Sequence, residues 1–165
     1  MPPGSRPRAG KWFKEWKMVN EELQAIGPLA PATASKGRIL FVDDEASIRD
    51  SSTEALRGQG YDVVPCKDGI EAVAYYRESW EDVDVVVLDL MMPKMSGHDT
   101  FLATQDINPG VKVVLLSGFS LDARVQAVLD AGALDYVKKP FRLAKLYEAV
   151  ARALSSENDA TLETS

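Results

Sequence analysis

Five short apolar runs alternate with five helix-like segments along most of this 165-residue chain. Each run is too short for a buried helix and is bounded by turn residues, so each predicts a β-strand. The third and fourth runs are almost continuously apolar, which is typical of strands covered on both faces. The predicted strands span 38–42, 62–66, 83–88, 111–116 and 135–138.

The intervals between the runs show helical spacing of apolar residues, and Gly or Pro residues close most of them. We predict helices over about 45–57, 69–78, 97–104, 121–130 and 142–154. Strict alternation of strand and helix indicates a parallel sheet with helices on both faces. Pro65 removes a ladder donor and places the second strand at an edge. The expected fold is therefore α/β, a flavodoxin-like (βα)5 doubly wound sheet with strand order 2-1-3-4-5.

The predicted domain spans 37–154 and follows an N-terminal extension over 1–36. Residues 1–10 are too polar to pack and are expected to be disordered. An amphipathic helix over about 11–26 and a Pro/Ala linker follow, and 155–165 is expected to be a flexible tail. The helix carries a stripe with heptad character, which fits docking on the domain, a two-stranded coiled coil or contact with a membrane surface. The stripe consists of Trp12, Trp16, Val19, Leu23 and Ile26.

The charge distribution limits the classes of partner. The net charge is −6, but residues 1–36 carry +3 and the remainder carries −9. A domain this acidic is not expected to bind DNA, but its negative charge favours binding of a divalent cation. No apolar run is long enough for a membrane span, and the first residues do not resemble a secretory signal. The single cysteine, Cys66, fits a reducing cytoplasm, where we expect the protein to be located.

Polar residues follow four of the predicted strands at the carboxyl ends, which meet at one rim of such a sheet. Carboxylates this close repel one another, and Mg²⁺ with oxygen ligands offsets that repulsion. A lysine and a hydroxyl at the same rim suit phosphoryl oxygens, and a carboxylate between them is a plausible nucleophile. The rim residues are Asp43, Asp44, Asp89, Ser117 and Lys139.

Each rim residue taken alone has a simpler explanation. Asp43 and Asp44 could open a helix, since acidic residues favour its first turn. Ser117 could be a turn hydroxyl and Lys139 a surface charge. The occurrence of such residues at the ends of four strands favours a functional site over these separate explanations.

Four separated motifs resemble the receiver domain of two-component response regulators. They lie at 41–45, 88–97, 116–118 and 136–141, and the resemblance covers about 36–154. It implies either a single-domain regulator or the receiver of a hybrid histidine kinase. Asp89 would then accept a phosphoryl group from a phosphohistidine. Asp44, Asp89 and the backbone carbonyl of Met91 would ligate Mg²⁺, with Asp43 acting through a metal-bound water.

The resemblance also implies a switch. Ser117 and Lys139 would bind the phosphoryl oxygens, and Tyr136 would change rotamer as Ser117 moves toward the phosphate. Output would run through the face formed by 121–130, 135–138 and 142–154. The implied partners are a histidine kinase or histidine phosphotransfer protein and a downstream protein target. A homodimer through the N-terminal helix is also possible.

The same resemblance implies a signalling domain that catalyses its own phosphorylation, and not an enzyme. Met91 and Phe119 occupy positions that govern water access in this family, and both are apolar, so we expect slow autodephosphorylation. Two alternatives stay open. One is a Mg²⁺-dependent phosphohydrolase with an aspartyl nucleophile, although its usual Asp-x-Asp pair follows the first strand. The other is a degenerate receiver that acts as a scaffold.

Overall fold

The computed structural model describes residues 35–163, with side chains described to residue 156. Its strands form one parallel sheet in the order β2-β1-β3-β4-β5, which confirms the predicted topology. The predicted N-terminal helix and nearly all of its linker lie outside the described residues. The strands are β1 (Arg38–Val42), β2 (Asp62–Cys66), β3 (Val85–Asp89), β4 (Val113–Ser117) and β5 (Asp135–Lys138).

Short polar side chains begin several of the helices. Asp68, Ser96 and Asp122 lie in extended backbone, and each side chain accepts a hydrogen bond from a backbone N–H of the following first turn. Such N-caps satisfy donors that have no partner within the helix. The helices are α2 (Ala46–Gly58), α3 (Gly69–Ser79), α4 (Gly97–Ile107), α5 (Ala123–Asp130) and α6 (Leu143–Glu163), with a 3₁₀ turn η1 (Trp80–Asp82) after α3.

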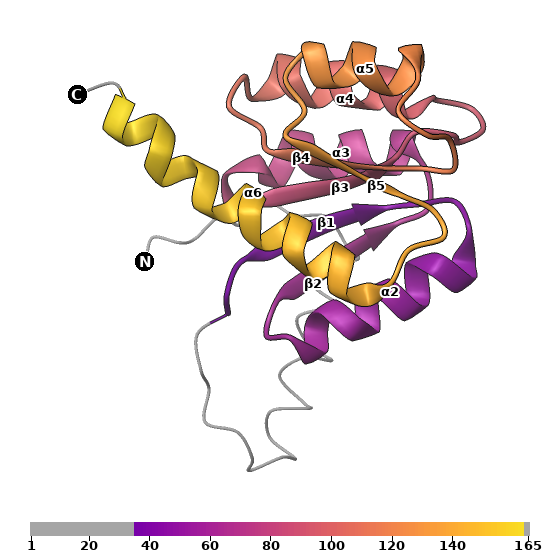
Figure 1. Cartoon of the computed structure of the whole chain (residues 1–165), viewed down its shortest axis with the longest axis horizontal. Coiled ribbons are helices and arrows are strands. Elements are labelled where there is room, and N and C mark those ends of the chain that lie inside the picture. The colour runs from indigo at the N-terminus through magenta and orange to yellow at the C-terminus, as the bar shows by residue number, and fades with distance from the viewer. Residues whose placement is uncertain (1–34, 164–165) are drawn as a thin grey trace. The chain divides into compact units, whose positions relative to one another are not determined.

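The helices divide between the two faces of the sheet (Figure 1). On one face α2 and α6 bury aliphatic side chains against alternate strand residues, including Phe41, Val87 and Leu116. On the other face α3, α4 and α5 pack against the intervening strand residues. Because both faces are covered, the strand residues of β3 and β4 are buried throughout.

The edge of the sheet at β2 has little capacity for further pairing. Pro65 lies there, as its missing N–H predicted, and it is exposed. The Arg57 side chain reaches across from α2, and its Nη2 donates to the backbone carbonyl of Val63 at 2.9 Å. At this edge Pro65 therefore has no N–H to donate, and the carbonyl of Val63 already accepts a hydrogen bond.

The third and fourth strands begin two residues later than predicted. The 3₁₀ turn ends in a hydrogen bond from the Val83 N–H to the Trp80 carbonyl, so Val83 belongs to the turn. Before β4, the Val111 N–H donates to the Asn108 carbonyl in a similar turn. The apolar residues at 83 and 111 therefore precede the strands.

Two helices continue past their predicted ends. α4 runs to Ile107, and α6 runs to Glu163, so the segment predicted as a flexible tail is helical over most of its length. No Gly or Pro follows Pro140 to end α6. On α6, Leu146 and Val150 are buried, whereas Leu143 in the first turn is 41% exposed. Within the described residues, no helix is long and apolar enough to cross a membrane.

Candidate functional site

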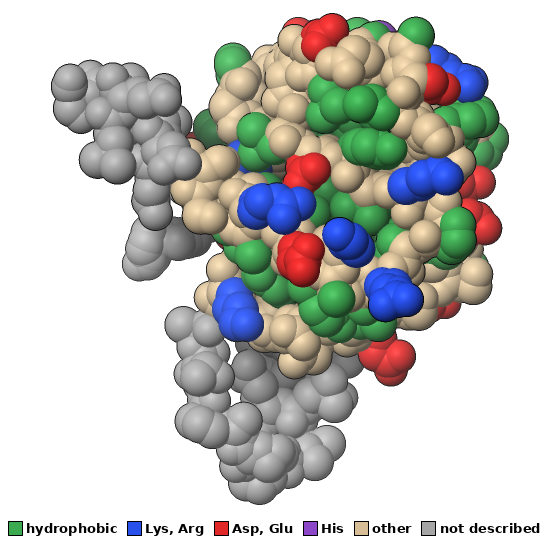
Figure 2. Space-filling model, viewed as in Figure 1, with side chains coloured by type: hydrophobic (Ala, Val, Ile, Leu, Met, Phe, Trp, Pro, Cys, Tyr) green, Lys and Arg blue, Asp and Glu red, His purple; other side chains and the backbone are tan. Residues whose placement is uncertain are grey.

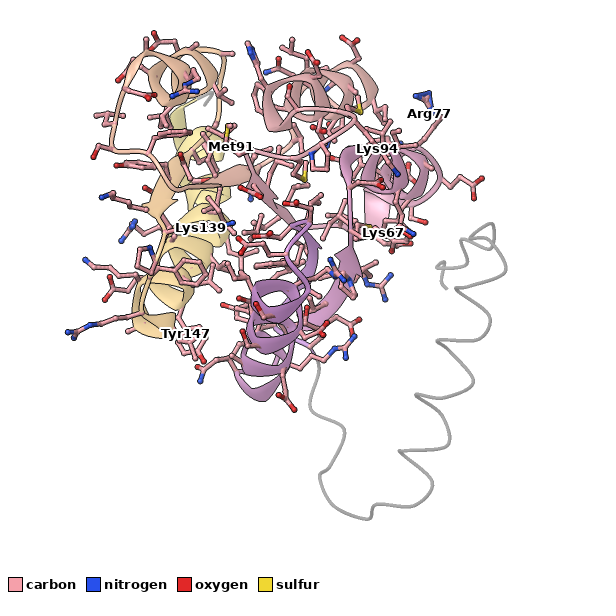
Figure 3. The ribbon with its side chains drawn as sticks, turned by 90° about the vertical axis from the view of Figure 1, so that its right-hand side faces the viewer. Lys67, Arg77, Met91, Lys94, Lys139 and Tyr147 are labelled. Atoms are coloured by element: carbon pink, nitrogen blue, oxygen red, sulfur yellow. The ribbon has the colours of Figure 1, made fainter. Side chains whose placement is uncertain are left out.

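The predicted rim residues do meet at the carboxyl ends of the strands. β3 ends at Asp89 and β4 at Ser117, whereas Asp43 and Lys139 directly follow β1 and β5. Figure 3 views this end of the sheet, with Lys139 and Met91 near the middle and Lys94 and Lys67 to one side. A parallel sheet places these residues together although they are far apart in the sequence.

Asp89 is the central carboxylate of the rim and is only 2% exposed. Its Oδ1 accepts a hydrogen bond from the Met91 N–H at 3.3 Å, and its Oδ2 lies 3.4 Å from Lys139 Nζ. Burial, followed by the negative charge of Asp43, raises the pKa of Asp89 to about 7, although Lys139 and the Met91 N–H oppose the shift. The site therefore disfavours the ionised form of Asp89 unless more positive charge is supplied.

Asp43 offers an oxygen suited to a cation. Its side chain is fully buried, and Oδ1 accepts from the Glu45 N–H at 2.9 Å. Oδ2 accepts no directional hydrogen bond, although the Lys139 ammonium lies 2.9 Å away. Oxygens of Asp43, Asp44 and Asp89 all lie within 4.8 Å of one another, and Asp44 is exposed to solvent. Three carboxylates this close together repel one another beside a single ammonium, and they fit a hard divalent cation that keeps some waters.

Lys139 lies among three carboxylates. Its Nζ is 2.9 Å from Asp43, 3.3 Å from Glu45 and 3.4 Å from Asp89, and its side chain is only 13% exposed. Burial alone would lower the pKa of Lys139, but the contact with Asp43 and the charge of Asp89 outweigh burial and raise it. A permanent ammonium at this position suits an anionic group attached to Asp89.

Ser117 ends β4 and Tyr136 lies within β5, and among the described residues neither side chain is hydrogen-bonded to the rim carboxylates. Ser117 is fully buried, its carbonyl accepts from the Lys139 N–H at 2.7 Å, and its Oγ accepts from the Phe119 N–H at 3.0 Å. Tyr136 is partly buried and packs against the core on the α3–α5 side of the sheet. Their proposed roles as phosphoryl ligand and switch stay predictions.

The loop after β3 passes very close to the end of that strand. Gly97 opens α4 and donates its N–H to the Leu90 carbonyl at 3.0 Å. A Cβ at this position would lie 2.4 Å from the Asp89 carbonyl oxygen. Glycine is therefore required there, and it holds the loop that carries Met91, whose side chain is 51% exposed.

Two charged contacts of the site were not predicted. Glu45 lies against Lys139, and Arg49 donates from Nη1 to the Asp43 carbonyl at 2.8 Å. Glu45 directly follows the Asp43-Asp44 pair, and Arg49 lies one helical turn later. These positions at the start of α2 could have predicted both contacts, because side chains there point back toward the start of the helix.

The comparison with protein families and relatives supports the arrangement. The response regulator receiver domain model matches residues 39–151. The DNA-binding response regulator MtrA of Mycobacterium tuberculosis is 37% identical over 126 residues, which are 76% of this chain and 54% of that protein. The sensor kinase CckA of Brucella abortus is 30% identical over 73% of this chain and 13% of that protein. The chain thus spans about half the length of MtrA, and the expected absence of DNA binding is not supported.

Solved structures share the fold. A CheY-like receiver domain protein from Methanospirillum hungatei has a TM-score of 0.70 and 28% identity, covering 76% of this chain and 99% of that one. The response regulator TrrA from Thermotoga maritima, solved in complex with Mg(2+)-BeF, has a TM-score of 0.64 and 33% identity, covering 72% of this chain and 99% of that one. Both cover nearly the whole of the compared structure.

Proposed function

The chain belongs to the response regulator receiver domain family, and from that premise we propose that Asp89 is the phosphoacceptor of this signalling domain. The observation that carries the proposal is the position of Asp89. It is a buried carboxylate at the end of a central strand, 3.4 Å from Lys139 and clustered with Asp43 and Asp44. This arrangement concentrates positive and cation-binding groups around one nucleophilic oxygen.

The proposed reaction transfers a phosphoryl group from a phosphohistidine. A bond forms between an Asp89 carboxylate oxygen and phosphorus while the phosphorus–nitrogen bond breaks, and the imidazole nitrogen keeps the electron pair. Little covalent chemistry is required of the other residues, because phosphoryl transfer depends on positioning and on charge stabilisation. Lys139 would bind a phosphoryl oxygen through its ammonium, and Ser117 would donate its hydroxyl to another.

Mg²⁺ is the proposed cofactor. Asp44, Asp89 and the Met91 carbonyl would hold it, with Asp43 acting through a metal-bound water. When bound, the ion neutralises the negative charge of the carboxylates and of the phosphoryl oxygens. The complex of TrrA with Mg(2+)-BeF supports this assignment by analogy.

Intact-mass measurement tests the acceptor. The full chain is incubated with acetyl phosphate and Mg²⁺, in parallel with Asp89→Asn. We expect one phosphoryl adduct on the wild type and none on the variant. Steady turnover of a small phosphoester would instead favour a phosphohydrolase, and a wild type without adduct would favour a scaffold.

We propose that the phosphorylated form decays slowly. Met91 and Phe119 are apolar, and neither can orient a water molecule for attack on phosphorus. Met91→Asn introduces an amide at the position two residues after the acceptor and should shorten the half-life of the adduct. A wild-type adduct that decays rapidly, and no faster in Met91→Asn, would contradict this proposal.

We propose that output runs through the face formed by α5, β5 and α6. Basic and acidic side chains lie side by side on the face that Figure 2 shows, and Arg152 pairs with Asp135 at 2.6 Å. Lys138 is exposed on this face, whereas Val137 is buried and cannot contact a partner directly. The proposed partners are a histidine kinase or phosphotransfer protein and a downstream protein, with a homodimer as a further possibility. DNA binding by a longer protein that contains this domain fits the name of MtrA.

A further inference from the structure

Glu45 places an additional carboxylate on the Lys139 ammonium. Its Oε1 lies 3.3 Å from Lys139 Nζ, and its side chain is 56% exposed to solvent. Asp43 and Asp89, by contrast, are buried and lie 2.9 Å and 3.4 Å from the same Nζ. Because these two buried carboxylates already hold the ammonium at the rim, the contact with Glu45 is not needed to keep it there.

The Glu45 side chain does little for the helix that it precedes. Glu45 is the N-cap of α2, but its side chain accepts no hydrogen bond from the first turn. Shorter polar residues serve that position better, as Asp68, Ser96 and Asp122 do for other helices. Among the described residues, Lys139 is the only side-chain partner of the Glu45 carboxylate. Glutamate at this position is therefore better explained by its contact with Lys139 than by capping.

The contact puts Glu45 in competition with any anion that binds Lys139. A phosphoryl oxygen that pairs with the ammonium has to displace the Glu45 carboxylate or share the ammonium with it. The carboxylates grouped closely enough to hold a cation are those of Asp43, Asp44 and Asp89, and Glu45 is not among them. Glu45 therefore stays available to Lys139 when that cluster is used for Mg²⁺.

We infer that Glu45 is a positioning residue that restrains the Lys139 ammonium and thereby disfavours phosphorylation by small anionic donors. The inference rests on the proposed function of Asp89 as phosphoacceptor. With acetyl phosphate, an Asp89 oxygen bonds to phosphorus, the bond from phosphorus to the acetyl oxygen breaks, and acetate leaves with the electron pair. A protein donor can offset the cost of separating Glu45 from Lys139 with contacts remote from the site, whereas a small donor cannot.

The first test measures the affinity of the full chain for beryllofluoride, an anionic phosphoryl mimic, by calorimetry in saturating Mg²⁺. Glu45→Gln removes the charge that competes for Lys139 and should tighten binding about two- to fivefold, the range expected for an exposed ion pair. Glu45→Asp keeps the charge but shortens the side chain, and its carboxylate can cap α2 instead. It should therefore tighten binding nearly as much.

The rate of phosphorylation gives a second readout. With acetyl phosphate below saturation, adduct formation followed by intact mass should be about two- to fivefold faster in both Glu45 variants. Glu54→Gln is the matched control, because Glu54 is an exposed glutamate on the same helix, about 13.5 Å further along its axis. That variant loses the same charge and should match the wild type in both measurements.

Equal affinities and equal rates in the wild type, Glu45→Gln and Glu45→Asp would overturn the inference but leave Asp89 as phosphoacceptor. A gain in Glu45→Gln that is absent from Glu45→Asp would also overturn it, because lost charge and not the lost contact would then be the cause. An equal gain in Glu54→Gln would have the same meaning. A wild type that binds no beryllofluoride and forms no adduct would overturn the proposed function, and the inference with it.

Discussion

Lys139 Nζ lies closer to Asp43 Oδ2, at 2.9 Å, than to Asp89 Oδ2, at 3.4 Å. The ammonium therefore lies in part of the space that a cation bound to Asp43 would fill. It also neutralises part of the negative charge that would attract such a cation. Two positive groups near the same carboxylates repel each other, so lysine and Mg²⁺ compete for the cluster. The ammonium balances the buried negative charge but opposes metal binding.

Removal of Lys139 should tighten Mg²⁺ binding while it impairs phosphorylation. We expect Lys139→Ala to bind Mg²⁺ several-fold more tightly, because one like charge is lost from the site. The same variant should bind beryllofluoride more weakly, because a ligand of the phosphoryl oxygens is missing. Titration of each ligand by calorimetry checks both effects. The exposed neighbour Lys138 provides the control, and weaker Mg²⁺ binding by Lys139→Ala than by Lys138→Ala would contradict the prediction.

The raised pKa of Asp89 predicts a pH-dependent loss of stability without metal. The folded state binds this proton more tightly than the unfolded chain does, since the pKa rises to about 7. The stabilisation is complete below about pH 4 and is lost as the pH rises to about 7. Relative to Asp89→Asn, the wild type should lose about 1 to 2 kcal/mol of unfolding free energy over that range, after allowance for solvent screening.

Urea unfolding in EDTA at several pH values measures this difference, and taking wild type minus variant cancels most other titrating groups. Saturating Mg²⁺ should reverse the trend, because the ion binds the ionised carboxylate. A difference that stays constant from pH 4 to pH 8 in EDTA would show that Asp89 ionises normally.

Gly97→Ala should destabilise the protein and displace the loop that follows Asp89. The new Cβ would lie 2.4 Å from the Asp89 carbonyl oxygen and 2.5 Å from the Leu90 Cα, and backbone atoms cannot rotate away. We expect a loss of about 1 to 3 kcal/mol in unfolding free energy and a lower yield of phosphorylated Asp89. Gly58→Ala is the matched control, because a Cβ there meets nothing within 4 Å. Equal stability of the two variants would argue against the close approach.

Lys94→Gly should stabilise the protein. Lys94 has a φ of 68°, a left-handed conformation that disfavours residues with a Cβ. Glycine removes that cost but adds chain entropy, which leaves a gain of about 0.5 to 1 kcal/mol in unfolding free energy. The ion pair with Asp68, at 3.7 Å and largely exposed on the lysine side, is weak and subtracts little. Thermal unfolding should show a higher midpoint for Lys94→Gly than for Lys94→Ala, which keeps the Cβ.

The topology and the rim could be predicted because both depend on order along the chain. Alternating strand and helix patterns leave few arrangements, and Pro65 places β2 at the edge. Polar residues at strand ends then must meet at one rim. The N-terminal helix over 11–26 lies outside the described residues and stays a prediction.

The contacts within the site depend on side-chain packing and could not be predicted from the sequence. Which carboxylate Lys139 approaches most closely is set by its rotamer and by Glu45, which comes from a different element. The stack of Arg124 on Phe119 likewise joins a loop to a helix through side-chain angles. The end of α6 was misplaced for a simpler reason, since no Gly or Pro follows it, whereas α4 extends almost to Pro109-Gly110.

The outer edge of β2 has a consequence for association between copies of this chain. A strand from another molecule that approached Pro65 would find no N–H to accept from, and at Val63 it would have to displace Arg57 from the carbonyl. Growth of the sheet across molecules is therefore disfavoured on this side. Contacts between copies are therefore favoured at helical surfaces or at the β5 edge. The β2 and β5 edges of the sheet thus differ in their capacity to pair with another strand.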